Sequence, residues 1–144
     1  MKTFMVSVVL AVAAMGLAPI AHAGMFLGNY SLDIQGRNDF HTWIWGITTC
    51  SPDCVLVTGI PQPIARGFNY QERAQLANGR YTLTIDDPWG LRCDNIYYGP
   101  TIPTHDVYSW DAATLAGTID SSYDASCYGG PGGTSTYTFS LQRF

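Results

Sequence analysis

The chain has 144 residues, of which 47% are hydrophobic and 13% aromatic, and its net charge is −4 at pH 7. This length is enough for one hydrophobic core and too short for two. Because the chain is acidic and has no basic run, neither nucleic acid nor an anionic membrane surface is an expected partner.

The first 23 residues have the pattern of a secretory signal peptide. Lys2 precedes an apolar run, and Ala21-His22-Ala23 has the small residues of a cleavage site. No basic stop-transfer cluster follows, so no membrane span is expected after cleavage. The sequence therefore predicts a signal peptide over 1–23 and a single all-β domain over 24–144. It predicts a secreted protein, in the extracellular or cell-envelope space.

Four cysteines follow the signal, and an even number in an exported chain favours disulfides. Cys50 and Cys54 enclose Ser-Pro-Asp, a turn between two segments rich in β-branched and aromatic residues, so they should face each other across a hairpin. Cys93 and Cys127 then form the second bridge. A zinc site would need closer pairs or histidines at ligand spacing, and a redox centre a two-residue spacing. No metal and no other cofactor is predicted.

After the signal, apolar and polar residues alternate with a period of two, as in half-buried β-strands. The segments with this pattern or with β-branched and aromatic residues are 29–36, 41–48, 55–60, 80–86, 105–111, 114–124 and 136–144. Segment 65–76 is either a strand or a short helical turn over 71–76. Asp-Asp-Pro-Trp-Gly at 86–90 should end a strand, and 91–103 should form a loop because Pro100 and Pro103 interrupt a strand ladder.

Seven or eight such strands in sequence order, joined by short turns, predict an antiparallel meander. The fold class is therefore all-β, either a small barrel or a sandwich, stapled by disulfides. If the meander is closed, Trp43, Trp45, Tyr108 and Trp110 are the candidates to line its interior and face an apolar ligand. The alternative is that these rings simply fill the core.

No catalytic residue is predicted. His105 and Asp106 are the one adjacent pair of base and carboxylate, but neighbouring side chains on a strand point to opposite faces, and no Ser lies in a Gly-x-Ser-x-Gly turn. Asp86, Asp87 and Asp94 have the oxygen ligands that calcium prefers. Since they lack the spacing of a calcium loop, they are interpreted as turn formers.

Three segments carry a resemblance to a known group of proteins: RYTLTIDDPWGLRC (80–93), YSWDAATLAGTIDSSYD (108–124) and TYTFSLQRF (136–144). They resemble small secreted actinobacterial proteins, mycobacterial ones especially, that have no assigned activity. The resemblance implies an exported β-protein with an architecture like that of calycin-type barrels. It supplies no catalytic motif.

The leading hypothesis is a secreted binding protein, for a small apolar ligand inside the fold or a cell-envelope component on its surface. One alternative is a secreted hydrolase that uses His105 with an acidic neighbour. Another is a structural envelope protein. An empty aromatic cavity would favour a carrier, polar side chains converging on a cavity would favour an enzyme, and a filled core with exposed rings would favour a surface binder.

Overall fold

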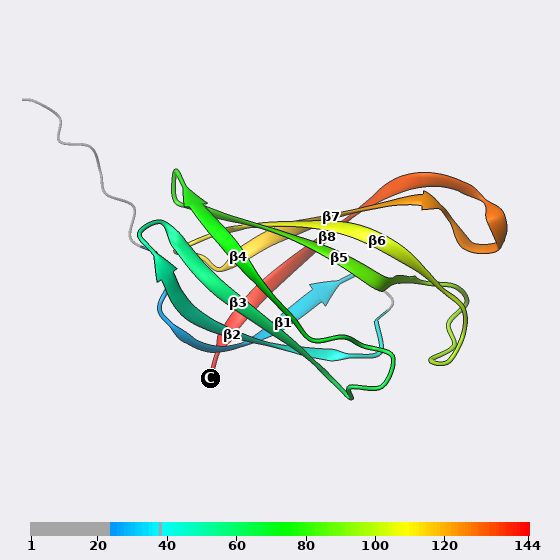
Figure 1. Cartoon of the computed structure of the whole chain (residues 1–144), viewed down its shortest axis with the longest axis horizontal. Coiled ribbons are helices and arrows are strands. Elements are labelled where there is room, and N and C mark those ends of the chain that lie inside the picture. The colour runs from blue at the N-terminus through cyan, green and yellow to red at the C-terminus, as the bar shows by residue number, and fades with distance from the viewer. Residues whose placement is uncertain (1–23, 38) are drawn as a thin grey trace, which may run out of the picture.

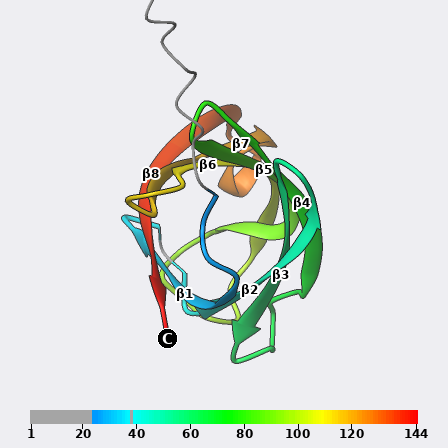
Figure 2. The same ribbon diagram turned by 90° about the vertical axis from the view of Figure 1, so that its left-hand side faces the viewer.

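Eight antiparallel strands in sequence order form a closed barrel in the computed structural model, which describes residues 24–37 and 39–144. They are β1 (Gly28–Gln35), β2 (Thr42–Ser51), β3 (Cys54–Gln62), β4 (Tyr70–Ala77), β5 (Arg80–Arg92), β6 (Thr101–Asp111), β7 (Ala116–Ala125) and β8 (Pro131–Arg143), and the 3-10 turn η1 (Cys127–Gly129) precedes β8 (Figure 1). Figure 2 looks along the barrel and shows the ring of strands.

The predicted all-β meander is confirmed, and of the two predicted architectures the barrel is the one that forms. The predicted signal peptide, 1–23, lies outside the described residues. Among the residues described, no helix is long and apolar enough to cross a membrane.

The alternation of residues along each strand determines which side chains face the interior. In β1, Tyr30 and Leu32 are buried while their neighbours are more exposed, as the period-two pattern predicts. Leu32 pairs with Trp43 of β2 on one side and with Leu141 of β8 on the other. The pairing of β1 with β8 closes the ring, so the barrel has one continuous core.

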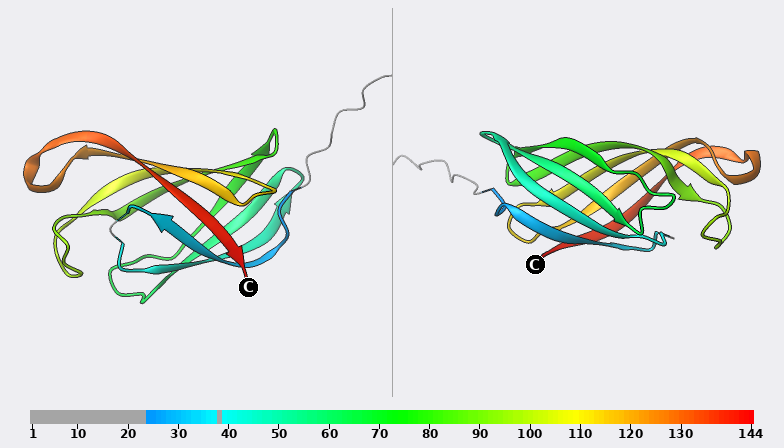
Figure 3. Two further views of the ribbon diagram at one scale, coloured as in Figure 1. Left: turned by 180° about the vertical axis from the view of Figure 1, so that it is seen from behind. Right: turned by 60° about the horizontal axis from the view of Figure 1, so that its bottom comes forward.

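The barrel has two different ends. At the turn end, tight turns join β2 to β3 and β4 to β5; in the second of these, Asn78 and Gly79 have φ of 51° and 75°, as a type I′ hairpin requires. The loop end contains the connections 36–41, 63–69 and 93–100. It also contains the β7–β8 tip, which is the connection 126–130 between these two strands. Figures 1 and 3 show that the β7–β8 tip extends furthest beyond the barrel.

Two predictions near the loop end need correction. Asp-Asp-Pro-Trp-Gly does not end β5, which continues to Arg92, and the predicted loop 91–103 is reduced to 93–100 because β6 begins at Thr101. The register shifts between Asp87 and Leu91, so an irregularity takes up the proline while the pairing with β6 resumes beyond it. Of the two alternatives predicted for segment 65–76, the strand is the one that forms, since β4 runs from Tyr70 to Ala77.

The strands β4 and β5 form the shortest pairing in the ring. They pair only over Gln75–Ala77 and Arg80–Thr82, beside their turn, and then diverge towards the loop end (Figure 1). Tyr70, at the start of β4, lies over Gly59 of β3, and a Cβ at Gly59 would collide with the Tyr70 ring. Gly59 is therefore needed for Tyr70 to reach the interior.

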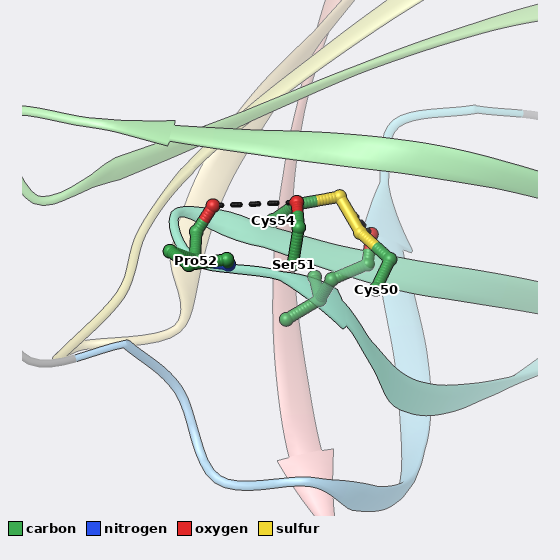
Figure 4. The surroundings of a disulfide bond; sticks show 5 residues. Cys50, Ser51, Pro52 and Cys54 are labelled. Carbon is green, nitrogen blue, oxygen red and sulfur yellow. Dashed lines mark hydrogen bonds between the residues drawn. A yellow bond between two sulfur atoms is a disulfide. The ribbon is translucent and has the colours of Figure 1, made fainter.

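Both predicted disulfides are confirmed. Cys50–Cys54 staples the β2–β3 turn, with Cα atoms 5.6 Å apart (Figure 4). Cys93–Cys127 joins the end of β5 to the β7–β8 tip, with Cα atoms 5.5 Å apart. The first bridge restrains one turn, whereas the second ties together two connections of the loop end.

We predict that the two bridges differ in their contribution to stability because they close loops of different length. The sequence separations are 4 and 34 residues. In the chain-entropy model, loops of these lengths correspond to a stabilisation of the fold by about 2 and about 4 kcal/mol. Denaturant unfolding of the Cys50→Ser/Cys54→Ser and Cys93→Ser/Cys127→Ser variants should show the larger loss for the second. An equal or reversed order would show that the large bridge does not restrain the unfolded chain as inferred.

Candidate functional site

Large rings fill the half of the barrel interior nearer the turn end. Trp45 and Trp110 are completely buried, and their ring centroids are 5.3 Å apart. Tyr108 lies 5.3 Å from Trp45, and Tyr81 stacks on Trp110 at 5.2 Å. At the turn end, buried Met25 donates its backbone N–H to the Tyr81 hydroxyl. This half of the interior is therefore occupied by side chains in mutual contact.

The four aromatic residues proposed to face a ligand all lie on the inner face of the barrel. Trp45, Tyr108 and Trp110 belong to the ring core just described. Trp43 lies nearer the loop end, where its indole N–H donates to Asp39 at 2.7 Å, while the indole N–H of Trp45 donates to the Tyr70 hydroxyl at 2.6 Å. The buried indole N–H of Trp110, in contrast, has no hydrogen-bond partner among the described residues. All four rings nevertheless pack against other core side chains, which favours core filling over ligand contact.

A buried ionic cluster fills the interior nearer the loop end. The side chain of Arg37, from the β1–β2 connection, is only 6% exposed and reaches Asp106 of β6 at 3.0 Å and Asp87 of β5 at 3.2 Å. It also donates to the Gly90 carbonyl at 2.9 Å. The second carboxylate oxygen of Asp106 accepts from Ser121 at 2.6 Å, and that of Asp87 accepts from the Trp89 N–H at 2.8 Å. Every carboxylate oxygen of the cluster thus has a donor.

The electrostatics of this cluster are set by burial and by the single guanidinium. Burial raises the pKa of Asp87, and the opposing effects of Arg37 and of the Trp89 N–H do not cancel that rise. Burial also acts to raise the pKa of nearby Asp39, but hydrogen bonds from Trp43 and His41 lower it below its ordinary value. The ionised form of Asp87 would therefore destabilise the fold if the positive charge of Arg37 did not compensate for it.

Exposed rings and arginines gather on the outside of the loop end. We call Phe40, Arg66, Arg92, Tyr97 and Tyr98 the end-face cluster. The guanidinium carbon of Arg92 lies 5.7 Å from the Phe40 ring centroid and 5.5 Å from that of Tyr97, and that of Arg66 lies 5.6 Å from that of Tyr98. Phe40 is 39% exposed and Tyr98 is 67% exposed. The cluster combines three loop-end segments in one surface.

Hydrogen bonds between connections hold this surface in place. Arg66 donates to the Gly99 carbonyl at 2.8 Å, Tyr97 donates through its hydroxyl to the Ala65 carbonyl at 2.6 Å, and Arg92 donates to the Tyr97 carbonyl at 2.9 Å. Within the part of the chain that the structure describes, neither Arg66 nor Arg92 forms an ion pair with a carboxylate. Their positive charges are therefore not neutralised by a carboxylate, although Arg92 also donates to the Arg66 carbonyl at 3.2 Å and lies 3.3 Å from His41 Nδ1.

A second surface feature is an open groove on the outer side of β5, β6 and β7, with a volume of about 620 Å³. Asp86, His105 and Ser122 lie opposite one another in register across these three strands and line it. His105 Nδ1 is 2.7 Å from Asp86. The Ser122 hydroxyl, however, donates to the backbone carbonyl of His105 at 3.3 Å and not to its imidazole. The order of residue types is that of a catalytic triad, but the serine is not hydrogen-bonded to its base.

The structure separates the acidic residues that the sequence places together. Asp86 faces outward, Asp87 faces the interior, and Asp94 accepts a hydrogen bond from Tyr128. Within residues 24–37 and 39–144, no group of three or more His, Cys, Asp or Glu side chains is placed to hold a metal ion. Asp106 points inward while His105 points outward, as expected of strand neighbours.

Sequence reasoning missed the ionic cluster and the end-face cluster. The inward positions of Asp87 and Asp106 follow from the alternation that also places Ile85 and Tyr108 inside, so this signal was available. Arg37 and the end-face residues lie in or beside connections, where no periodicity applies. Their association depends on the closure of the barrel.

The comparisons with known proteins give no family for this barrel. No protein-family model matches the chain, and neither the curated proteins nor the solved structures provide a match. The resemblance to secreted actinobacterial proteins therefore stays a prediction. Function has to be inferred from the geometry of the described residues.

We predict that replacing Arg37 by Met destabilises the fold by about 3–5 kcal/mol at neutral pH, because it leaves buried carboxylates without their cation. Since burial already raises the pKa of Asp87, losing the opposing guanidinium raises it further. A carboxyl whose folded-state pKa lies above its unfolded value stabilises the fold in its protonated form, at low pH. The deficit, meaning the difference in unfolding free energy between wild type and Arg37→Met, should therefore be smaller at about pH 4.5 than at about pH 7.

Denaturant unfolding at both pH values measures this effect. The matched control is Arg73→Met, because Arg73 is exposed on β4. Its cost should be less than about 1 kcal/mol at either pH. A deficit for Arg37→Met that stays constant or grows on acidification would contradict the assigned role of the guanidinium.

Proposed function

We propose that this chain is an exported binding protein that recognises a cell-envelope component through the end-face cluster. The observation that carries the proposal is the combination of a filled interior with exposed rings outside. Ring side chains occupy one half of the barrel and the Arg37 cluster occupies the other, whereas Phe40 and Tyr98 present their rings to solvent. Binding by the surface thus has better support than transport of a ligand inside the barrel.

The composition of the end-face cluster supports recognition of a partner. Tyr and Arg are enriched at the centres of protein interfaces because they combine a large apolar area with polar groups. Here Arg66 and Arg92 stack near rings and use part of their donor capacity on backbone carbonyls. The side chains are therefore already ordered before a partner arrives, which lowers the entropic cost of binding.

The disulfides support export. Cys50–Cys54 closes a local turn and Cys93–Cys127 joins two connections distant in sequence, and such bonds persist in oxidising compartments. Together with the signal-like pattern of residues 1–23, they support a location in the extracellular or cell-envelope space. The resemblance to secreted actinobacterial proteins points to the same location.

The hydrolase alternative has one specific observation in its favour, the contact between His105 and Asp86. Their side chains are 53% and 87% exposed, so water screens the pair, and the Ser122 hydroxyl has a different partner. A screen against ester and amide substrates decides this alternative. Activity that is lost in a folded His105→Ala variant would establish hydrolysis as the function.

We predict that Tyr98→Ala weakens binding to envelope fragments of the producing organism by about tenfold, the size expected for an interface hot spot. Co-sedimentation of the purified protein with these fragments measures the effect. Phe144→Ala is the matched control, since Phe144 is 72% exposed and lies at the turn end, beside Asn29. Equal retention of the two variants, or a larger loss for Phe144→Ala, would overturn the proposed role of the end-face cluster.

A further inference from the structure

The outer groove on β5, β6 and β7 is a site separate from the end-face cluster. Its volume of about 620 Å³ lies within the range of small-molecule pockets, about 300–1,000 Å³. Because β4 diverges from β5, the edge of β5 that faces β4 has no pairing with that strand beyond Thr82. Phe68, from the connection that precedes β4, lines the groove. Its shape therefore depends on the short β4–β5 pairing.

The walls of the groove are largely apolar. Phe68, Pro88, Pro103 and Tyr123 line it. Phe68 also packs on the core and lies 5.6 Å from the Tyr70 ring and 6.4 Å from the Trp89 ring, which fixes its position. Pro88 of β5 and Pro103 of the neighbouring strand β6 add rigid apolar surface. A ligand with an apolar body would find preformed contacts on these walls.

The charged groups of the groove are of one sign. Asp86 and Asp124 line it and are exposed, and none of the arginines of the described chain contributes to its lining. Asp87 also borders it, but its charge is paired with Arg37 inside the barrel. The one basic group is His105, whose Nδ1 contacts Asp86. Acidic groups beside apolar walls concentrate a negative potential in the groove.

A metal ion does not fit this arrangement. Among the described residues, Asp86, His105 and Asp124 do not converge into a metal-binding group. An organic cation does not need a closed shell of ligands, because its charge is spread over an ammonium group. Nearby carboxylates are sufficient to attract it. Its apolar body can rest on the walls, and the Phe68 and Tyr123 rings are of the kind that attract cations.

We propose that the groove binds a small organic cation, an amine with an aromatic or aliphatic body. The ammonium group lies between Asp124 and Asp86, and the body packs against Phe68 and the two prolines. This site is independent of the end-face cluster, so either can fail without affecting the other. Its ligand enters from solvent and does not need to displace the ring core.

The experiment compares tryptamine with N-acetyltryptamine, which have the same ring system but differ in charge. Calorimetric titration of the intact protein should show tryptamine binding at least about tenfold more tightly, with weaker binding at high salt. Amide signals of β5, β6 and β7 should shift in NMR spectra on titration. Equal affinities for the two compounds, no binding of tryptamine, or signal shifts confined to other strands would overturn the proposal.

A pair of variants tests the role of the carboxylates. Asp124→Asn should weaken tryptamine binding by about fivefold to tenfold, since it removes an exposed charge from the groove. Asp33→Asn makes the same change of charge on β1 and does not touch the groove, so it should leave the affinity unchanged. Both positions are exposed, and circular dichroism verifies that both variants fold. Equal effects of the two substitutions would show a general influence of net charge and would overturn the proposed site.

Discussion

Closure of eight strands into a ring leaves an interior just wide enough for side chains, and this interior has to be filled. The chain fills it in two layers. Large rings around Trp45 and Trp110 occupy the half nearer the turn end. Nearer the loop end, the filling is the ion-paired side chain of Arg37 between Asp87 and Asp106. Burial of three charged groups is tolerable only because each has several hydrogen-bonding partners.

The same two layers hold the proposed recognition surface in place. Arg37 belongs to the β1–β2 connection, so its ion pairs fix the segment that carries Phe40 three residues later. Cys93–Cys127 fixes the start of the β5–β6 connection, which carries Tyr97 and Tyr98. Interior packing and the large disulfide thereby position the exposed rings of the loop end. The filled barrel and the ordered end-face cluster are two consequences of one arrangement.

The sequence was sufficient for those features that depend on local pattern. Alternation identified the inner faces of β1, β5 and β8, and the Ser-Pro-Asp turn identified the partner of Cys50. The course of β5 beyond Asp87 was not predicted, because an irregularity in a strand lets it continue past a proline. Neither cluster was predictable from the local pattern. Arg37 and Asp106 form an ion pair although they are 69 residues apart in the sequence. The end-face cluster combines segments that become neighbours only when the ring closes.

We propose that recognition takes place on the outside of a filled barrel. NMR spectra of the ¹⁵N-labelled protein, titrated with solubilised envelope fragments, test it most directly because they report each indole and each amide separately. We expect the Tyr97 and Tyr98 amide signals to shift, while the indole N–H signals of Trp45 and Trp110, both buried in the ring core, stay unchanged. Shifts of those two indole signals without any change at the loop end would contradict surface recognition and place the ligand inside the barrel.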